Sequence, residues 1–293
     1  MKTQSIAAKT GVGAVDLGVT DGDRALRFYR EYVGLTPLAS MGSEIRLGAA
    51  GRELVVLHPD AERPVVPRRS GLYHLAIVVP DRRELARVIA RLARLQWDQY
   101  PTDHVMTKAN YLWDPDGNGI EIYTESPEDG TMAFANGTFV AYYKDGRPRS
   151  GRDPIDLEEL FSHLGSDDRL DQAMPAGTKM GHIHLHVSDV DDALRFYHDL
   201  VGFDVMGHVP GVGFVSAGGY HHHVGLNTWA GQGAPPAPAG SAGLRRYTIE
   251  LPAKGDLHDV VGRLEHGGVQ VVEEAGGLAA IDPSANRVLF RVA

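Results

Sequence analysis

The same pattern of strand, turn and helix occurs twice in the chain, and this repeat restricts the fold more than any other feature of the sequence. The segment VDLGVTDGDRALRFYREYVGL begins at Val15, and the similar segment IHLHVSDVDDALRFYHDLVGF begins 168 positions later at Ile183. In each, a strand of alternating residues precedes an amphipathic helix that ends in Val-Gly. Asp21 and Asp189 lie where an acidic side chain is favourable at a helix start. The sequence therefore predicts two copies of one structural unit.

A second pair of similar segments lies between and after these copies. GLYHLAIVVPDRRELARVIARLARL begins at Gly71, and GLRRYTIELPAKGDLHDVVGRLEHGG begins 172 positions later at Gly243. Each is followed by an Asp-Pro turn and an apolar strand, WDPDGNGIEIY at 113–123 and IDPSANRVLFRV at 281–292. The chain therefore consists of four half-units, numbered one to four in chain order. Each contains a strand, a helix and further strands, which predicts an α+β fold.

The half-units divide the sequence into two segments and a connection. Residues 11–126 contain half-units one and two, and residues 179–293 contain half-units three and four. A length of 293 residues suits two domains. Residues 127–178 link them, and there TFVAYYKDG predicts a hairpin and DPIDLEELFSHL predicts a short capped helix. Residues 230–242, AGQGAPPAPAGSA, are typical of a loop because they are small and rich in proline.

Composition excludes several functional classes. The formal net charge is −9, so the cationic surface of a nucleic-acid-binding protein is not expected. The chain has no cysteine, which excludes disulfides, iron–sulfur clusters and cysteine nucleophiles and fits a reducing cytoplasm. No apolar run is long enough to cross a membrane, and MKTQSIAAKTGVGAV lacks the apolar core of a signal peptide. We therefore expect a cytoplasmic protein without nucleic-acid or membrane partners.

Five arginines recur at helical spacing in half-unit two. This spacing predicts a solvated helix face rather than a nucleic-acid-binding surface. The five are Arg82, Arg83, Arg87, Arg91 and Arg94.

Four segments resemble one known superfamily, and together the resemblance covers nearly the whole chain. They are GLYHLAIVVPDR, YLWDPDGNGIEIYTE, MGHIHLHVSDVDDALRFYHDLVGF and FVSAGGYHHHVGLNTWAG. The chain is similar to the vicinal-oxygen-chelate superfamily of glyoxalases, bleomycin resistance proteins and extradiol dioxygenases, and most of all to its catechol 2,3-dioxygenase branch. The resemblance implies βαβββ half-units that pair around a metal ion. The expected fold is therefore α+β, with four βαβββ half-units forming two paired, cupped mixed sheets.

The resemblance also implies a metal centre of two histidines and one carboxylate, the ligand set of many non-haem iron(II) oxygenases. In the superfamily, one histidine lies on the first strand of a half-unit, and the other two ligands lie on the first and last strands of its partner. Half-unit three has His182 at this position, and half-unit two has His74 and Glu121. We therefore predict that half-unit two pairs with half-unit three, and that half-units one and four form a pair without ligands. The corresponding positions elsewhere hold Ala14, Arg246 and Leu289.

Each of these ligands also has an ordinary structural interpretation. His74 lies in the apolar strand LYHLAIVVP, where a lone histidine is more often a core residue than a ligand. Glu121 lies between two isoleucines, where a solvent-facing strand position is the alternative to a buried carboxylate. His182 shares one strand face with His184 and His186, so not all three can bind one ion. The three ligands are chosen because they match the superfamily positions together.

Three further residues are candidates for proton transfer and substrate binding. Ring cleavage of a catechol requires groups that accept and donate protons, and histidine suits this role near neutral pH. In GGYHHHVGLN, strand alternation would place His221 and His223 on one face. The superfamily position favours His223 as the acid–base residue, and His221 remains a possible choice. The alternative is that these histidines form a surface cluster without a catalytic role. The resemblance adds Tyr111 and His104 as substrate-contacting residues, although Tyr111 is also typical of a half-buried strand.

We conclude from the sequence that an Fe(II)-dependent extradiol ring-cleaving dioxygenase is expected. Its substrates would be a catechol-type compound and O2, and Mn(II) is the alternative to Fe(II). Such an activity belongs to aromatic hydrocarbon catabolism. A glyoxalase-type isomerase or a hydroquinone dioxygenase is the second hypothesis, and a non-enzymatic small-molecule-binding module is the third. Glyoxalase sites usually need a fourth protein ligand, and the GLNTW strand of half-unit three has no acid. The sequence leaves a homo-oligomer open.

Overall fold

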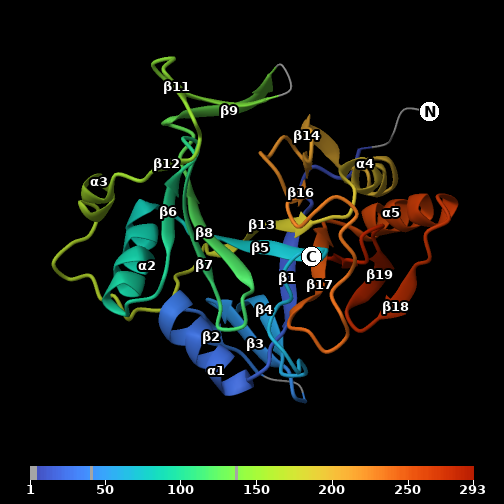
Figure 1. The fold of residues 1–293 in the computed structure, drawn as a ribbon, viewed down its shortest axis with the longest axis horizontal. Helices are drawn as coiled ribbons and strands as arrows, with labels where there is room; N and C mark the ends of the chain where they lie inside the picture. Colours follow the sequence, from blue (N-terminus) through green and yellow to red (C-terminus); the bar gives the residue numbers. More distant parts are fainter. Residues whose placement is uncertain (1–4, 40–41, 136–137) are drawn as a thin grey trace.

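The computed structural model describes residues 5–39, 42–135 and 138–293. Their strands form two large mixed sheets and one small sheet, and the helices lie around the outside (Figure 1). The α+β fold predicted from the repeats is therefore confirmed. No helix in the described ranges is long and apolar enough to cross a membrane.

The nine-stranded sheet combines half-units two and three. They meet through β5 (Gly71–Val78) and β13 (Lys179–His186), which run antiparallel. This contact confirms the predicted pairing of the second and third half-units. The strand order is β12 (Asp153–Pro154), β6 (Tyr100–Asp103), β7 (Thr107–Trp113), β8 (Gly119–Glu125), β5, β13, β16 (Val224–Asn227), β15 (Val212–Ser216) and β14 (Asp204–Val209).

The eight-stranded sheet combines half-units one and four. They meet through β1 (Gly11–Gly18) and β17 (Gly243–Leu251), again antiparallel, which confirms the second predicted pair. Both segments of the sequence repeat therefore contribute to both sheets, and their division into two domains remains a prediction. The strand order is β18 (Val272–Glu274), β19 (Gly277–Ile281), β20 (Arg287–Val292), β17, β1, β4 (Arg52–His58), β3 (Ile45–Ala49) and β2 (Thr36–Pro37).

Each half-unit places its helix directly after its first strand. Half-units two and four have regular helices of 13 residues, α2 (Arg82–Arg94) and α5 (Lys254–His266). In half-units one and three, Asp21 and Asp189 cap a short α-helix by accepting from a backbone N–H three positions later. Each short helix continues into a π-helical turn, giving α1 (Gly22–Arg27) with η1 (Phe28–Val33) and α4 (Val190–Leu194) with η2 (Arg195–Val201).

The connection between the repeats contains a strand hairpin and a short helix where the sequence predicts them. The hairpin is part of a three-stranded sheet that projects from the body of the protein on the side of β14 (Figure 1). The elements are β9 (Gly130–Ala135), β10 (Thr138–Tyr143), β11 (Pro148–Arg149) and α3 (Leu157–Phe161).

The arginines of α2 do not all form a solvated face. Arg87 and Arg91 are buried, so the prediction is wrong for these two residues. Arg87 pairs with Asp168, and Arg91 Nη1 donates to the Val33 carbonyl at 2.9 Å. Arg91 also donates through Nε and Nη2 to two carbonyls of the connection. A guanidinium can be buried where its several donors find acceptors, and here it joins α2 to η1 and to the connection.

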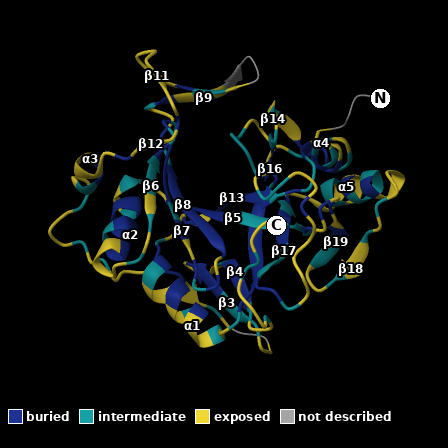
Figure 2. Cartoon of the chain, in the orientation of Figure 1, coloured by how far each residue is buried: buried dark blue, intermediate teal, exposed yellow. Residues whose placement is uncertain are grey.

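Two equivalent Asp-Pro turns, in half-units two and four, form hydrogen bonds to the half-unit that precedes each of them. The Tyr29 hydroxyl donates to Asp114 Oδ2 at 3.2 Å, and the Tyr197 hydroxyl donates to Asp282 Oδ2 at 2.9 Å. Each aspartate also accepts backbone and side-chain N–H groups from the asparagine four positions later. The strands β8 and β13 at the centre of the molecule are largely buried (Figure 2). The turns therefore fasten half-unit one to two and half-unit three to four.

Candidate metal centre

One cross-strand row of the nine-stranded sheet brings the candidate ligands together. Glu121 of β8 is opposite Ala76 of β5, and Ala76 is opposite His182 of β13. Tyr111 of β7 extends the row on the other side of Glu121. Residues opposite one another on neighbouring strands share a face of the sheet. The short side chain of Ala76 therefore leaves space between Glu121 and His182, and His74 lies two positions along the same strand.

The ligand atoms of these side chains converge in that space. His74 Nε2 and His182 Nε2 each lie 3.1 Å from Glu121 Oε2. All three residues are at most 5% exposed. Two ligands about 2.1 Å from a metal on adjacent corners of an octahedron lie about 3 Å apart. The spacing of the donor atoms thus matches that of a single shared ion.

Electrostatics and hydrogen bonding also fit a cation at this point. Burial raises the pKa of the Glu121 carboxyl, but His182 and His74 outweigh it and hold that pKa well below its usual range. In the described ranges, no lysine or arginine forms an ion pair with Glu121. Both ring nitrogens of His74 and Nδ1 of His182 are buried without a hydrogen-bond partner. A buried carboxylate without a cationic partner is costly, and a divalent cation bound by Glu121 and by the Nε2 atoms of His74 and His182 would satisfy it.

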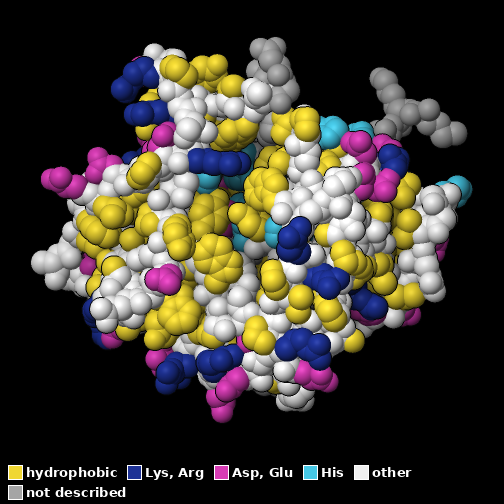
Figure 3. Space-filling model, viewed as in Figure 1, with side chains coloured by type: hydrophobic (Ala, Val, Ile, Leu, Met, Phe, Trp, Pro, Cys, Tyr) yellow, Lys and Arg dark blue, Asp and Glu magenta, His cyan; other side chains and the backbone are white. Residues whose placement is uncertain are grey.

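A cavity of about 530 Å³ borders the cluster. This volume is within the usual range of small-molecule sites. Histidine side chains are visible inside a hollow bordered by hydrophobic side chains in Figure 3. The three-stranded sheet and the β14–β15 hairpin supply most of its apolar wall, with Met132, Ala133, Phe139, Met206, Val209, Val212 and Phe214.

Tyr111 and His104 line this cavity as a hydrogen-bonded pair. His104 Nε2 lies 2.8 Å from the Tyr111 hydroxyl. The rings of Tyr111 and His74 are 5.4 Å apart between centroids. Burial and the Glu121 charge raise the pKa of the Tyr111 hydroxyl well above its usual value. The hydroxyl therefore stays protonated, and it donates to His104 Nε2 because His104 Nδ1 faces the Gly151 carbonyl.

The structure does not bring His223 to the cavity. Its Nδ1 accepts from the Ala217 N–H at 3.2 Å and lies 2.8 Å from the Ser216 hydroxyl. Strand alternation fails here because residues 221–223 form a bend, and β16 begins only at Val224. The structure thus places His223 outside the cavity lining, whereas the neighbouring His221 and His222 are part of it.

His221 and His222 form a second group with His182. One ligand atom from each of the three lies within 4.8 Å of the others, as in the group of His74, Glu121 and His182. Burial and the neighbouring His182 lower the pKa of His221 to about 3 and the pKa of His222 well below its usual value. Both rings are therefore neutral near neutral pH. The sequence pattern HHH indicated this region, but the assignment within it depends on the bend.

A hydrogen-bond network beside His221 was not anticipated from the sequence. The Tyr220 hydroxyl donates to Glu125 Oε1 at 2.5 Å and lies 2.5 Å from the Tyr123 hydroxyl. His221 Nδ1 lies 4.0 Å from Glu125 Oε2, and the Glu125 side chain is 37% exposed. The partly exposed Glu125 carboxylate therefore lies between solvent and His221, whose Nδ1 has no hydrogen-bond partner. No sequence motif marks the network, because it joins β8 to the bend before β16.

The structure defines a class of protein in which βαβββ half-units pair through their first strands. In this chain, two histidines of the paired strands β5 and β13 and one carboxylate of β8 form the candidate metal site. The family model described as the Glyoxalase/Bleomycin resistance protein/Dioxygenase superfamily matches residues 11–122 and 179–279. The chain belongs to this superfamily.

Individual relatives agree with this assignment. The chain is 39% identical over 284 residues to a catechol-2,3-dioxygenase of Bacillus subtilis (strain 168), covering 95% of this chain and 96% of the relative. Among solved structures, a putative dioxygenase from Bacillus subtilis subsp. subtilis str. 168 has a TM-score of 0.64 at 13% identity, covering 99% of this chain and 86% of that one. Glyoxalase I from Zea mays has a TM-score of 0.58 at 12% identity, covering 97% and 92%. These structures support the fold alone.

Proposed function

We propose that this protein is an Fe(II)-dependent extradiol ring-cleaving dioxygenase that acts on catechol-type substrates with O2. The observation that carries the proposal is the convergence of His74, Glu121 and His182 at one point beside an apolar cavity. The catechol-2,3-dioxygenase to which the chain is 39% identical supports the same reaction.

His74, Glu121 and His182 would hold the ion, with Fe(II) as the expected metal and Mn(II) as the alternative. A site with two imidazoles and one carboxylate suits either ion and leaves positions free for substrate. When bound, the ion would supply the redox chemistry by which O2 is added to the ring. Glu121 is the only carboxylate among the described residues that line the cavity, which favours this set over a glyoxalase site with a fourth protein ligand.

Five residues would handle the substrate and its protons. We assign the acid–base role to His221, because its imidazole lines the cavity beside the candidate ligand His182 and can exchange protons with a bound catechol. Glu125 and Tyr220 would pass that proton toward solvent. The Tyr111 hydroxyl, which donates to His104 across 2.8 Å, would accept a hydrogen bond from a substrate hydroxyl. The apolar wall would exclude water from the reacting ring.

Turnover of catechol tests the proposal. The full-length protein is loaded with Fe(II) without oxygen, mixed with catechol or substituted catechols, and then exposed to O2. We expect a yellow ring-opened product and uptake of one O2 per substrate. Glu121→Gln should lower turnover by at least about a hundredfold, because a neutral amide is a far weaker ligand.

The matched control is Glu265→Gln, which makes the same change on the exposed surface of α5 and should leave turnover unchanged. Iron content is measured for all three proteins. Absence of turnover with every catechol in an iron-loaded wild type would contradict the proposal. Equal iron content and activity in Glu121→Gln would refute the ligand assignment alone.

A further inference from the structure

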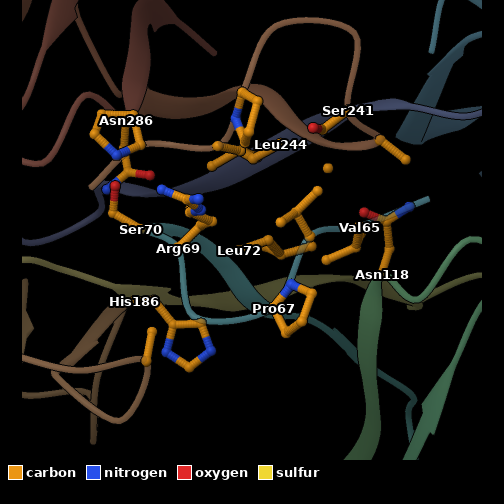
Figure 4. Close-up of a pocket in the computed structure, with 18 of the residues that line it drawn as sticks. Val65, Pro67, Arg69, Ser70, Leu72, Asn118, His186, Ser241, Leu244 and Asn286 are labelled. Atoms are coloured by element: carbon orange, nitrogen blue, oxygen red, sulfur yellow. The ribbon is translucent and has the colours of Figure 1, made fainter. Parts of the chain in front are cut away.

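A second pocket, of about 680 Å³, lies between the two loops that join half-unit one to two and half-unit three to four (Figure 4). The loops hold each other through backbone bonds: the Ser70 N–H donates to the Pro235 carbonyl at 3.0 Å, and the Ala242 N–H donates to the Arg63 carbonyl at 2.8 Å. The two Asp-Pro turns close its other sides. Among lining residues, only Tyr73 and Trp229 are shared with the cavity beside the metal centre.

The pocket is cationic although the chain has a net charge of −9. Four arginines line it, against the single carboxylate of Asp60. Asp60 pairs with Arg245 at 2.7 Å, and Arg287 pairs with Glu274. Among the residues that the structure describes, Arg68 and Arg69 have neither an ion pair nor a hydrogen bond. The local excess of positive charge is therefore unneutralised.

Arg69 is the more informative of these two residues. Its side chain is partly buried, and its guanidinium points into the pocket in Figure 4. A partly buried arginine commonly has a carboxylate or carbonyls as partners for its several donors. Arg91 satisfies this rule through backbone carbonyls, whereas Arg69 does not. A bound anion would supply the missing partner through charge-assisted hydrogen bonds.

Two more features of the lining point to a ligand. The Ser241 hydroxyl and the Asn118 side-chain oxygen are buried without a hydrogen-bond partner. Each of these residues is at most 3% exposed. Arg68 and Ala285 adopt φ angles of 61° and 66°, a strained region for residues other than glycine. Orphaned buried polar atoms are rare, and local backbone strain is found most often at active sites and ligand-binding segments.

The remaining wall is apolar. Trp113 forms part of the rim and is 44% exposed. An inorganic anion would leave this apolar surface uncovered, whereas an organic acid would cover it and reach the arginine. The apolar residues include Val65, Pro67, Leu72, Pro236 and Leu244.

We propose that this pocket binds an organic carboxylate with an apolar body, and that Arg69 contacts the carboxylate. The proposal does not depend on ring cleavage, since it concerns residues outside the metal centre. Binding is measured on the full-length, metal-free protein, so its result is separate from that of the turnover experiment.

Benzoate is the probe, and the signals of the three tryptophans are the readout. The indole N–H signals are followed by NMR during titration, and Trp113→Phe assigns the one signal that belongs to this pocket alone. We expect Trp113 to shift with benzoate. Arg69→Gln should weaken that binding at least about tenfold, because it removes a charged hydrogen bond. Arg94→Gln, the same change on the exposed end of α2, should have no effect.

Further measurements define the chemistry of the ligand and show whether a loss of binding is caused by misfolding of the Arg69→Gln variant. Arg69→Lys keeps the charge and should retain binding within a few-fold. Benzamide, which lacks the charge, and inorganic phosphate, which lacks the apolar body, should both bind more weakly than benzoate. Equal binding of phosphate would overturn the assignment of an organic ligand. A shift of Trp229 without Trp113, unchanged in Arg69→Gln, would place benzoate in the other cavity and overturn the proposal.

Discussion

The run of three histidines allows the acid–base assignment to be tested with matched substitutions. His221→Gln should lower kcat by at least about a hundredfold, the usual contribution of a general acid or base. His223→Gln should change kcat by less than about threefold, because His223 bonds Ser216 and Ala217 outside the cavity. His222→Gln, which also alters the cavity, should mainly raise KM. Steady-state kinetics of the iron-loaded variants check this, and a larger loss in His223→Gln would reverse the assignment.

Single residues were predictable where their position lies within a regular strand. The resemblance to the superfamily placed His74, Glu121 and His182 on regular strands, and the structure brings their ligand atoms together. The orientation of His223 was not predictable, because a bend precedes β16 and cancels the alternation rule. The burial of Arg91 was equally hidden, because its acceptors are carbonyls distant in the sequence.

At the scale of elements, the Asp-Pro turns offer a second test. Tyr29→Phe and Tyr197→Phe each remove one hydrogen bond to a buried aspartate, which should cost about 1–3 kcal/mol. The loss should be larger for Tyr197, whose oxygen also accepts from the Tyr247 hydroxyl at 2.8 Å. Urea unfolding of each variant measures the free energy of unfolding.

Tyr32→Phe is the control for this pair, since Tyr32 packs on Phe28 at 5.7 Å between ring centroids. No hydrogen bond of its hydroxyl is found among the described residues. It should change the unfolding free energy by less than about 0.5 kcal/mol. Stabilities of Tyr29→Phe and Tyr197→Phe equal to that of Tyr32→Phe would show that the turns do not fasten the half-units.

Whole helices and strands were predictable from local sequence signals, whereas the π-helical distortions of two helices were not. Aspartates before apolar helices predicted the starts of α1 and α4, and Gly34 and Gly202 end the following turns with φ of 97° and 100°. The π-helical turns η1 and η2 have no comparable sequence signal, since they arise where a helix adjusts to its packing. The three-stranded sheet was visible as a hairpin, but its contribution to the cavity wall depends on tertiary position.

At the scale of the whole molecule, the pairing of half-units determines where a site can form. Half-units two and three share a sheet, so His74 and His182 meet although each comes from a different copy of the repeat. Pairing of half-unit one with two and of three with four would have left every candidate site without at least one ligand. The arrangement was predictable because the ligand positions are distributed unequally among the four copies. The second pocket was not predictable from the sequence, because it is formed by two loops that carry no motif.

The histidine-rich centre should make the stability of the metal-free protein depend on pH. Burial, followed by the charge of His182, lowers the pKa of His221 to about 3 and that of His223 to about 4. In the unfolded chain a histidine has a pKa of about 6.5. Between about pH 6.5 and 4 the unfolded state therefore binds more protons, so the unfolding free energy falls as pH falls. Above about pH 6.5 both states are neutral and this contribution to stability is complete.

His223→Gln isolates one part of this effect without touching the candidate ligands. Its unfolding free energy, measured in urea at pH 7, 6 and 5, should fall less steeply than that of the wild type, by about 2 kcal/mol over this range. His258→Gln, at an exposed position of α5, should keep the wild-type slope. The slope is the test, because losing the Ser216 and Ala217 contacts lowers stability equally at every pH. A wild-type slope in His223→Gln would mean that His223 titrates in the folded protein as it does in the unfolded chain.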